Sequence, residues 1–156
     1  MKEEYIREFR RVLRIFDQEL FIQNHASCCN GISLPQCLTL LEIERCREIS
    51  VSNLASRLSL DKSTVSRTID GLVSIKLVKR VTPRENRRLA LIHLTNSGRQ
   101  VCAEINYTNH HYVKQILKDF SGEEQELFLS LFRKLAGNMT AYRIKDQEPE
   151  GKVPEE

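Results

Sequence analysis

The chain has 156 residues, of which 40% are hydrophobic and 29% are charged. This length suits one globular domain that buries its core without disulfides or bound metal. Its apolar runs fall short of the roughly 18 residues that a membrane-spanning helix needs. Its charged first residues are unlike the apolar segment of a secretion signal. We therefore expect a cytoplasmic protein with no membrane partner.

The positive charge is concentrated in one stretch of the chain. Between Arg45 and Arg99 there are twelve lysines and arginines against four acidic residues, whereas the whole chain has a formal net charge of only +3. The rest of the chain is therefore net acidic. Such asymmetry is typical of a surface that meets the phosphates of nucleic acid.

The cysteine pattern gives no sign of a structural framework. The five cysteines are an odd number, which argues against paired disulfides in a cytoplasmic chain. They form no pair of CxxC motifs, so neither a zinc site nor any other cofactor is expected. The cysteines are Cys28, Cys29, Cys37, Cys46 and Cys102.

Apolar periodicity predicts two helices in the first part of the chain. The first runs from about Glu3 to Asn24 and carries a narrow apolar seam of Ile6, Phe9, Leu13, Phe16 and Leu20. After the break at Asn30-Gly31, a second helix starts near Ser33, has Pro35 in its first turn and ends near Cys46. Its inward residues are expected to be Leu34, Leu38 and Leu41.

Two short capped helices and a hairpin follow. Ser50 is placed to cap a helix that carries Leu54, Ala55 and Leu58. Asp61 is placed to cap the next helix, which runs to about Ser74 and buries Val65, Ile69 and Leu72. Residues 77–81 and 89–94 are then expected to form two short strands.

Two longer helices end the predicted fold. Thr95 is placed to cap the first, and Ser121 with Glu124 forms a capping box for the second. The last helix has an apolar seam of Phe128, Phe132, Leu135, Met139 and Tyr142. The seams of the first and last helices either pack on the domain's own core or pair with a second copy, and periodicity alone leaves both open.

The helix after Asp61 has the chemistry of a DNA-reading element. One of its faces packs, and the other can donate to base edges and phosphates. The candidate contacts are Lys62, Ser63, Thr64, Ser66 and Arg67. Arg67 is the best candidate for guanine because its guanidinium can bond two acceptors, and Asp70 is expected to orient Arg67 or another arginine. Taken alone, this helix could also be an ordinary surface helix with solvated charges.

The hairpin strengthens the DNA-binding interpretation. Its connection carries Arg84, Arg87 and Arg88 with few acids to balance them. Clustered guanidinium groups repel one another unless anions are near, and the negative potential of a narrow minor groove stabilises them.

A family resemblance rests on these residues in combination. The run Leu54-Ala55, Asp61-Lys-Ser-Thr-Val-Ser-Arg67, Leu77-Val78-x-Arg80 and Leu94-Thr95-x-x-Gly98 resembles the winged-helix core of the MarR family. The resemblance covers about residues 5–142. It implies a mainly α fold with a small β-wing and about six helices, dimerising through the N- and C-terminal helices. It also implies a homodimer on double-stranded DNA, with the helix of residues 61–74 in the major groove and Arg88 in the minor groove.

On this basis we expect one integrated domain with four parts. Residues 1–32 form a dimerisation helix and loop, 33–98 the winged helix-turn-helix core, 99–142 the C-terminal dimerisation helices, and 143–156 a disordered tail. The function implied is a transcriptional regulator, usually a repressor at a palindromic operator.

Three residues depart from the family pattern. Ser59 and Lys76 stand where glycine is common, so a positive φ at either position costs energy. Asn86 stands where an aspartate commonly precedes the key wing arginine, so it offers Arg88 no ionic partner.

Family members commonly release DNA when a small phenolic compound, an oxidant or a metal binds, so an effector is expected. Cys28, Cys29 and Cys37, with Cys102 on a later helix, are candidate sensing residues. Three interpretations stay open: oxidation of exposed thiols, binding of a thiophilic metal, or buried packing beside an organic ligand.

Proteins of other classes fit less well. The chain has no glycine-rich phosphate loop, HExxH motif or nucleophile elbow, so an enzyme is not expected. The alternative is a helical, dimeric protein-interaction module that does not read DNA, which leaves the arginine hairpin unexplained.

Overall fold

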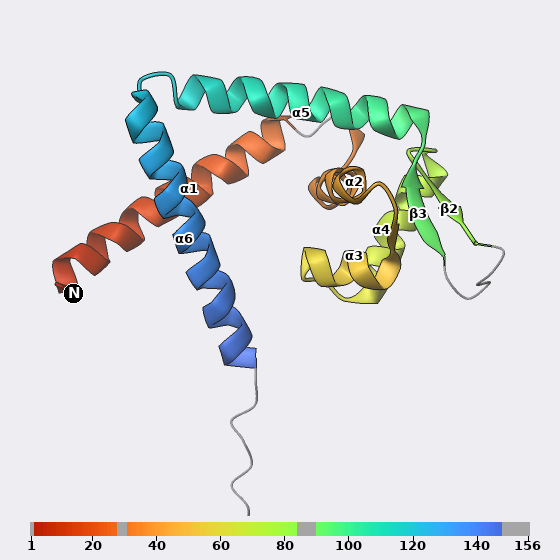
Figure 1. The fold of residues 1–156 in the computed structure, drawn as a ribbon, viewed down its shortest axis with the longest axis horizontal. Helices are drawn as coiled ribbons and strands as arrows, with labels where there is room; N and C mark the ends of the chain where they lie inside the picture. The colour runs from red at the N-terminus through yellow and green to blue at the C-terminus, as the bar shows by residue number, and fades with distance from the viewer. Residues whose placement is uncertain (1, 28–30, 84–89, 148–156) are drawn as a thin grey trace, which may run out of the picture. The chain divides into compact units, whose positions relative to one another are not determined.

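The computed structural model describes residues 2–27, 31–83 and 90–147. Within them lie six helices and three short strands (Figure 1). In chain order these are α1 (Glu3–Ser27), α2 (Leu34–Cys46), β1 (Ile49–Ser50), α3 (Val51–Leu58), α4 (Lys62–Ser74), β2 (Val78–Val81), β3 (Leu91–Leu94), α5 (Asn96–Ile116) and α6 (Gly122–Gln147). The chain divides into two compact units, residues 1–110 and 111–156. The predicted fold class, a winged helix-turn-helix of about six helices, is confirmed.

The helix starts follow the predicted caps. Ser50 Oγ accepts from the Asn53 amide at 3.2 Å, and Thr95 Oγ1 accepts from the Gly98 amide at 3.0 Å. The Ser121 amide donates to Glu124 Oε2 at 2.7 Å, which is the predicted capping box. α6 continues to Gln147, past the boundary predicted at residue 142. Residues 148–156 of the predicted tail lie outside the described part of the chain.

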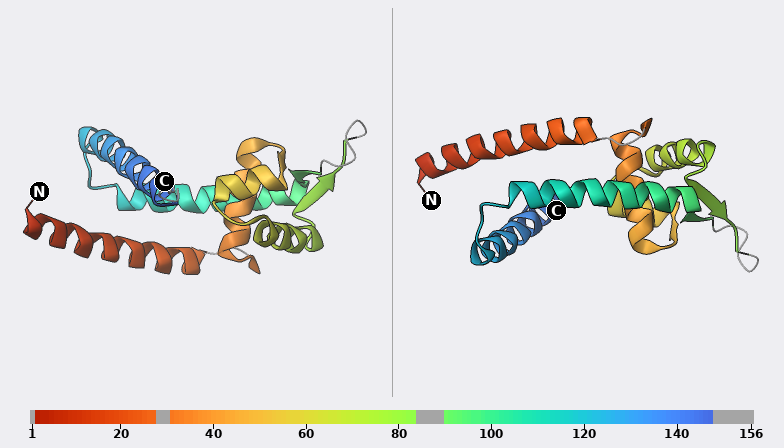
Figure 2. Two further views of the ribbon diagram at one scale, coloured as in Figure 1. Left: turned by 90° about the horizontal axis from the view of Figure 1, so that it is seen from below. Right: turned by 90° about the horizontal axis from the view of Figure 1, so that it is seen from above.

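The core is formed by α2, α3 and α4 together with the sheet. In the views of Figure 2 these helices, coloured orange to yellow-green, cluster beside the first turns of α5. Six large side chains are completely buried there: Leu40, Ile43, Leu54, Ile69, Leu72 and Ile92. The predicted inward face of α4 is confirmed, because Val65, Ile69 and Leu72 are all buried.

The predicted inward face of α2 is wrong in part. Leu41 packs against the core, but Leu38 is 50% exposed and Leu34 is only partly buried. The buried residues are Cys37, Thr39, Leu40 and Ile43. Apolar residues occur on most sides of this helix, so spacing alone does not single out one face.

The sheet has a strand that periodicity did not predict. Its order is β1-β3-β2, and Ile49 of β1 pairs with Ile92 of β3. β1 is only two residues long, too short for an alternating pattern to reveal. β2 and β3 are antiparallel, with Lys79 opposite His93 and Arg80 opposite Ile92.

Both positions where glycine was expected have a positive φ. Ser59 has φ 54° and Lys76 has φ 62°. The predicted backbone cost at these two turns is therefore present, since residues with a Cβ rarely occupy this region.

The terminal helices expose their apolar seams in the single chain. The five seam residues of α1 are 37% to 42% exposed, and Met139 and Tyr142 of α6 are 57% and 73% exposed. Among the described residues, no helix has the length and apolar character needed to cross a membrane.

We predict that Gly98→Ala strongly destabilises the protein. An added Cβ would overlap the carbonyl group of Leu77, which is backbone and cannot swing away. We expect a loss of about 2–4 kcal/mol in the free energy of unfolding, measured by urea denaturation. The control is Gly122→Ala, because among the described residues no atom lies within 4 Å of its added Cβ. Equal stability of the two variants would contradict the close approach.

Candidate nucleic-acid interface

The N-terminus of α4 is organised by the carboxylate of Asp61. Its Oδ1 accepts from the Thr64 amide at 2.8 Å, its Oδ2 accepts from the Thr64 hydroxyl at 2.6 Å, and Ser63 also donates to it. The Ser63 and Thr64 hydroxyls, followed by the Thr64 amide, hold the pKa of Asp61 well below its usual range. The cap thus stabilises the first turn of the helix that is proposed to meet DNA.

The outward face of α4 carries the predicted contact residues. Lys62, Ser63 and Arg67 are exposed, and Thr64 and Ser66 are partly buried. Within the described part of the chain, no acidic group pairs with the Arg67 guanidinium. Its donors are therefore available to an outside acceptor, whereas the hydroxyl protons of Ser63 and Thr64 already serve Asp61.

An ion pair joins α4 to the wing. Arg80 Nη2 on β2 lies 2.8 Å from Asp70 Oδ1 on α4. This confirms that Asp70 orients an arginine, and the arginine is Arg80. The side chains are 39% and 58% exposed, so we assign the pair a role in geometry and little in stability.

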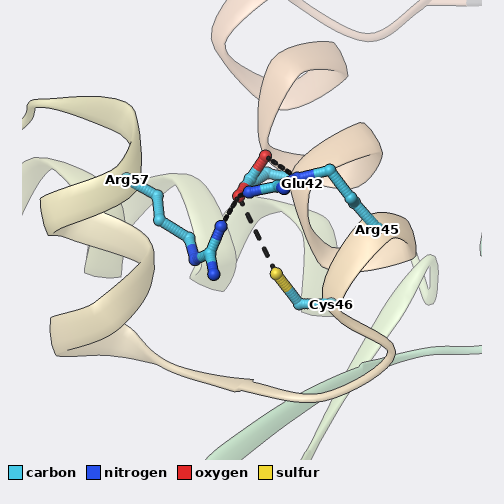
Figure 3. Close-up of polar contacts among 4 residues, drawn as sticks. All are labelled: Glu42, Arg45, Cys46 and Arg57. Carbon is cyan, nitrogen blue, oxygen red and sulfur yellow. Dashed lines mark hydrogen bonds and ion pairs between the residues drawn. The ribbon is translucent and has the colours of Figure 1, made fainter.

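A second charged cluster joins α2 to α3 (Figure 3). Glu42 Oε1 accepts from Arg45 at 2.7 Å and from Arg57 at 3.1 Å, and the thiol of Cys46 lies 3.8 Å from the same oxygen. Glu42 thereby fixes the first helix of the helix-turn-helix against the helix before it. Residues 15 apart along the chain meet here, which no local pattern in the sequence indicates.

Several predicted residues lie outside the described part of the chain. These are the wing arginines Arg84, Arg87 and Arg88, together with Asn86, Cys28 and Cys29. Their predicted roles stay predictions.

The two described candidate thiols lie in the core. Cys37 is 6% exposed and Cys102 is completely buried. Burial, and secondarily the charge of Glu44, raises the pKa of Cys102 to about 11. A buried thiol with a raised pKa favours packing over reaction with oxidants. Among the described residues no three His, Cys, Asp or Glu side chains form a group that could hold a metal ion.

The sequence reasoning missed two basic residues of β2. Arg80 belongs to this surface through its ion pair with Asp70, whereas Lys79 is exposed on the other side of the strand. Strand alternation was the available signal, since Arg80 shares a face with the buried Val78 while Lys79 faces the other way.

Comparisons with known proteins agree with this geometry. Residues 32–89 match the sequence profile of the MarR family. The chain is 28% identical over 111 residues to the uncharacterized HTH-type transcriptional regulator YdgJ of Bacillus subtilis, covering 71% of this chain and 68% of YdgJ.

Two solved structures show the same fold. A MarR family protein from Bacillus stearothermophilus superposes with a TM-score of 0.80 at 25% identity, covering 90% of this chain and 99% of that one. Streptococcus pneumoniae FabT, solved in complex with DNA, superposes with a TM-score of 0.78 at 21% identity, covering 88% and 99%.

We predict that Asp61→Ala lowers the thermal midpoint, whereas Asp61→Asn keeps a capping oxygen and most of the stability. Because the folded pKa is depressed, the carboxylate contributes fully above about pH 5 and loses its contribution progressively as the pH falls from there toward the folded pKa. Circular dichroism melts from pH 7 to pH 3 measure both effects. Asp119→Asn, at an exposed residue between α5 and α6, controls for the loss of one charge. A midpoint of Asp61→Ala equal to that of the control would rule out the capping role.

Proposed function

We propose that this chain, which carries a MarR family domain, regulates transcription by binding DNA. It acts as a repressor, binds a palindromic operator as a homodimer and releases the operator on a chemical signal. The observation that supports this proposal is the outward face of α4, where Arg67 lacks an acidic partner among the described residues. The ion pair of Asp70 with Arg80 fixes that face relative to the wing.

In this proposal α4 lies in the major groove and reads the operator. Arg67 donates to guanine, Ser66 lies one residue before it on the same outward side, and Lys62 meets phosphate at the start of the helix. Two copies of α4 in a dimer would read half-sites about 34–36 Å apart, one turn of the duplex.

The wing extends the contact to the minor groove. Arg84, Arg87 and Arg88 follow β2, the strand that Arg80 joins to α4. The electrostatic attraction of an arginine to DNA is strongest where the minor groove is narrow and its negative potential is concentrated. The proposed main contact there is Arg88.

The homodimer is supported by the apolar seams of α1 and α6. Soluble monomers rarely expose large continuous apolar surfaces. The seam residues of α1 are more than a third exposed in the single chain, as are most of those of α6. A second copy that pairs the same helices would remove these side chains from water.

The signal is proposed to be a small effector that shifts the separation of the two reading helices. Sensing by Cys28 or Cys29 belongs to the same proposal, whereas Cys37 and Cys102 are placed to pack. The expected site of action is the cytoplasm. The alternative is a dimeric interaction module that does not bind duplex DNA, and salt-dependent binding to DNA discriminates between the two.

We predict that Arg67→Ala reduces sequence preference. Duplexes selected from random DNA by binding serve as the operator, and a scrambled duplex serves as the reference. We expect the free-energy difference between them to shrink by about 1–3 kcal/mol, because one bidentate base contact is lost. The matched control is Lys62→Ala, which should weaken both duplexes about equally, as a phosphate contact does. Equal losses on both duplexes for Arg67→Ala would remove its base-reading role.

We predict that Leu13→Glu dissociates the dimer. Placing a carboxylate in the α1 seam should weaken association by about 2 kcal/mol or more, since the charge loses water without gaining a partner. Sedimentation equilibrium measures the dissociation constant. Arg7→Glu, on the opposite side of the same helix, is the control for added charge. A dimer unaffected by Leu13→Glu would show that this seam lies outside the interface.

A further inference from the structure

A second basic site lies away from the outward face of α4. A pocket of about 460 Å³ opens between the end of α2, the outer side of β2 and β3, and the first turns of α5. Its lining includes two apolar residues that are almost wholly buried, Ile43 and Leu94. The other lining residues are charged or polar: Glu44, Arg47, Lys79, His93 and Arg99.

The charges of this pocket do not cancel. Three permanent cations, Arg47, Lys79 and Arg99, face one carboxylate, Glu44. Glu44 also accepts a hydrogen bond from Asn106 Nδ2 at 2.9 Å. In the cluster around Glu42 the excess is smaller, because two cations, Arg45 and Arg57, both pair with one carboxylate at 2.7 and 3.1 Å. The pocket thus keeps an excess of two positive charges.

Two of the basic groups are held in place by the fold. Lys79 stands directly opposite His93 in the β2–β3 ladder, so the two side chains lie on the same face of the sheet. His93 Nε2 also lies 3.9 Å from Glu48 Oε2, outside the pocket lining. Arg99 donates to the Leu94 carbonyl at 3.2 Å and to Asn96 Oδ1, which fixes its guanidinium at the rim.

The backbone conformation of Arg47 independently indicates that this residue has a functional role. Arg47 has φ 63° and ψ −45°, and the Glu48 amide donates to the Cys46 carbonyl across it at 2.7 Å. This geometry is the strained γ-turn, in which glycine would be the least costly residue. An arginine at such a position costs stability, and strain of this kind is typical of residues kept for function.

We propose that this pocket binds a small organic dianion, a molecule with a doubly charged oxyanion and a short apolar body. The two excess positive charges match the oxyanion, and the short body would lie against a lining that includes the apolar Ile43 and Leu94. Binding itself does not depend on the proposed DNA function. An effect of the bound anion on DNA binding would rest on the proposed function. It would act through β2, because Lys79 precedes Arg80, the residue that joins β2 to α4.

The test uses the full chain without DNA. Isothermal titration at constant ionic strength compares inorganic phosphate, phenyl phosphate and acetate. We expect saturable binding of one phosphate per chain, tighter binding of phenyl phosphate and no saturable binding of acetate. Failure of phosphate and phenyl phosphate to saturate would overturn the proposal.

Two variants assign the binding to the pocket. Lys79→Ala and Arg47→Gly should each weaken phosphate binding roughly tenfold, as expected for loss of one charge-assisted contact. Arg47→Gly relieves the positive φ, so it should fold at least as well as the native chain. The control is Lys114→Ala, which removes an exposed cation of α5 that does not line the pocket. Unchanged affinity in both pocket variants would place the anion elsewhere and overturn the proposal.

A phosphate of the DNA backbone is the other source of the same chemistry. If the pocket served it, Lys79→Ala would lower the salt dependence of DNA binding by about one unit, and free phosphate and phenyl phosphate would not saturate. That pair of results would overturn the small-molecule assignment while leaving the DNA-binding function intact. Loss of DNA binding alone would leave the anion assignment untouched.

Discussion

The arrangement of this domain depends on one close contact, where the start of α5 meets the start of β2. Gly98 lies so near the Leu77 carbonyl that a side chain would overlap it. The same carbonyl accepts the Thr95 amide at 3.0 Å, and Thr95 Oγ1 donates to the Lys76 carbonyl at 2.7 Å. This junction fixes the strand that follows α4 against the helix that leads out of the domain.

The two faces of β2 contact different parts of the protein, because neighbouring residues of a strand point to opposite sides of the sheet. Arg80 turns to α4 and pairs with Asp70, so the wing and the outward face of α4 keep one geometry. Lys79 turns to the other side, where it meets Arg99 and Arg47 around the basic pocket. A four-residue strand therefore lies between a surface suited to DNA and a site suited to a small anion.

Local chemistry explains which parts of this fold could be predicted from the sequence. Four residues could be identified as caps because a capping hydroxyl or carboxylate accepts from an amide only three residues away: Ser50, Asp61, Thr95 and Ser121. The buried face of α4 followed from its clear periodicity. The face of α2 did not, since that helix is apolar on most sides and tertiary packing selected Cys37, Leu40 and Ile43. β1 escaped prediction because its pairing partner lies more than 40 residues further along the chain.

Of the described non-glycine residues with a positive φ, two could be predicted from the sequence and one could not. Ser59 and Lys76 could be singled out in advance, because a family pattern places glycine at both turns, and both have a positive φ. Arg47 had no such signal, yet its φ is also positive, and it lines the basic pocket with two other cations. At Ser59 and Lys76 the strain serves turns that connect elements of the core. At Arg47 a glycine would make the same turn at lower cost. The role of the Arg47 guanidinium in the pocket therefore accounts for a strained residue at this position.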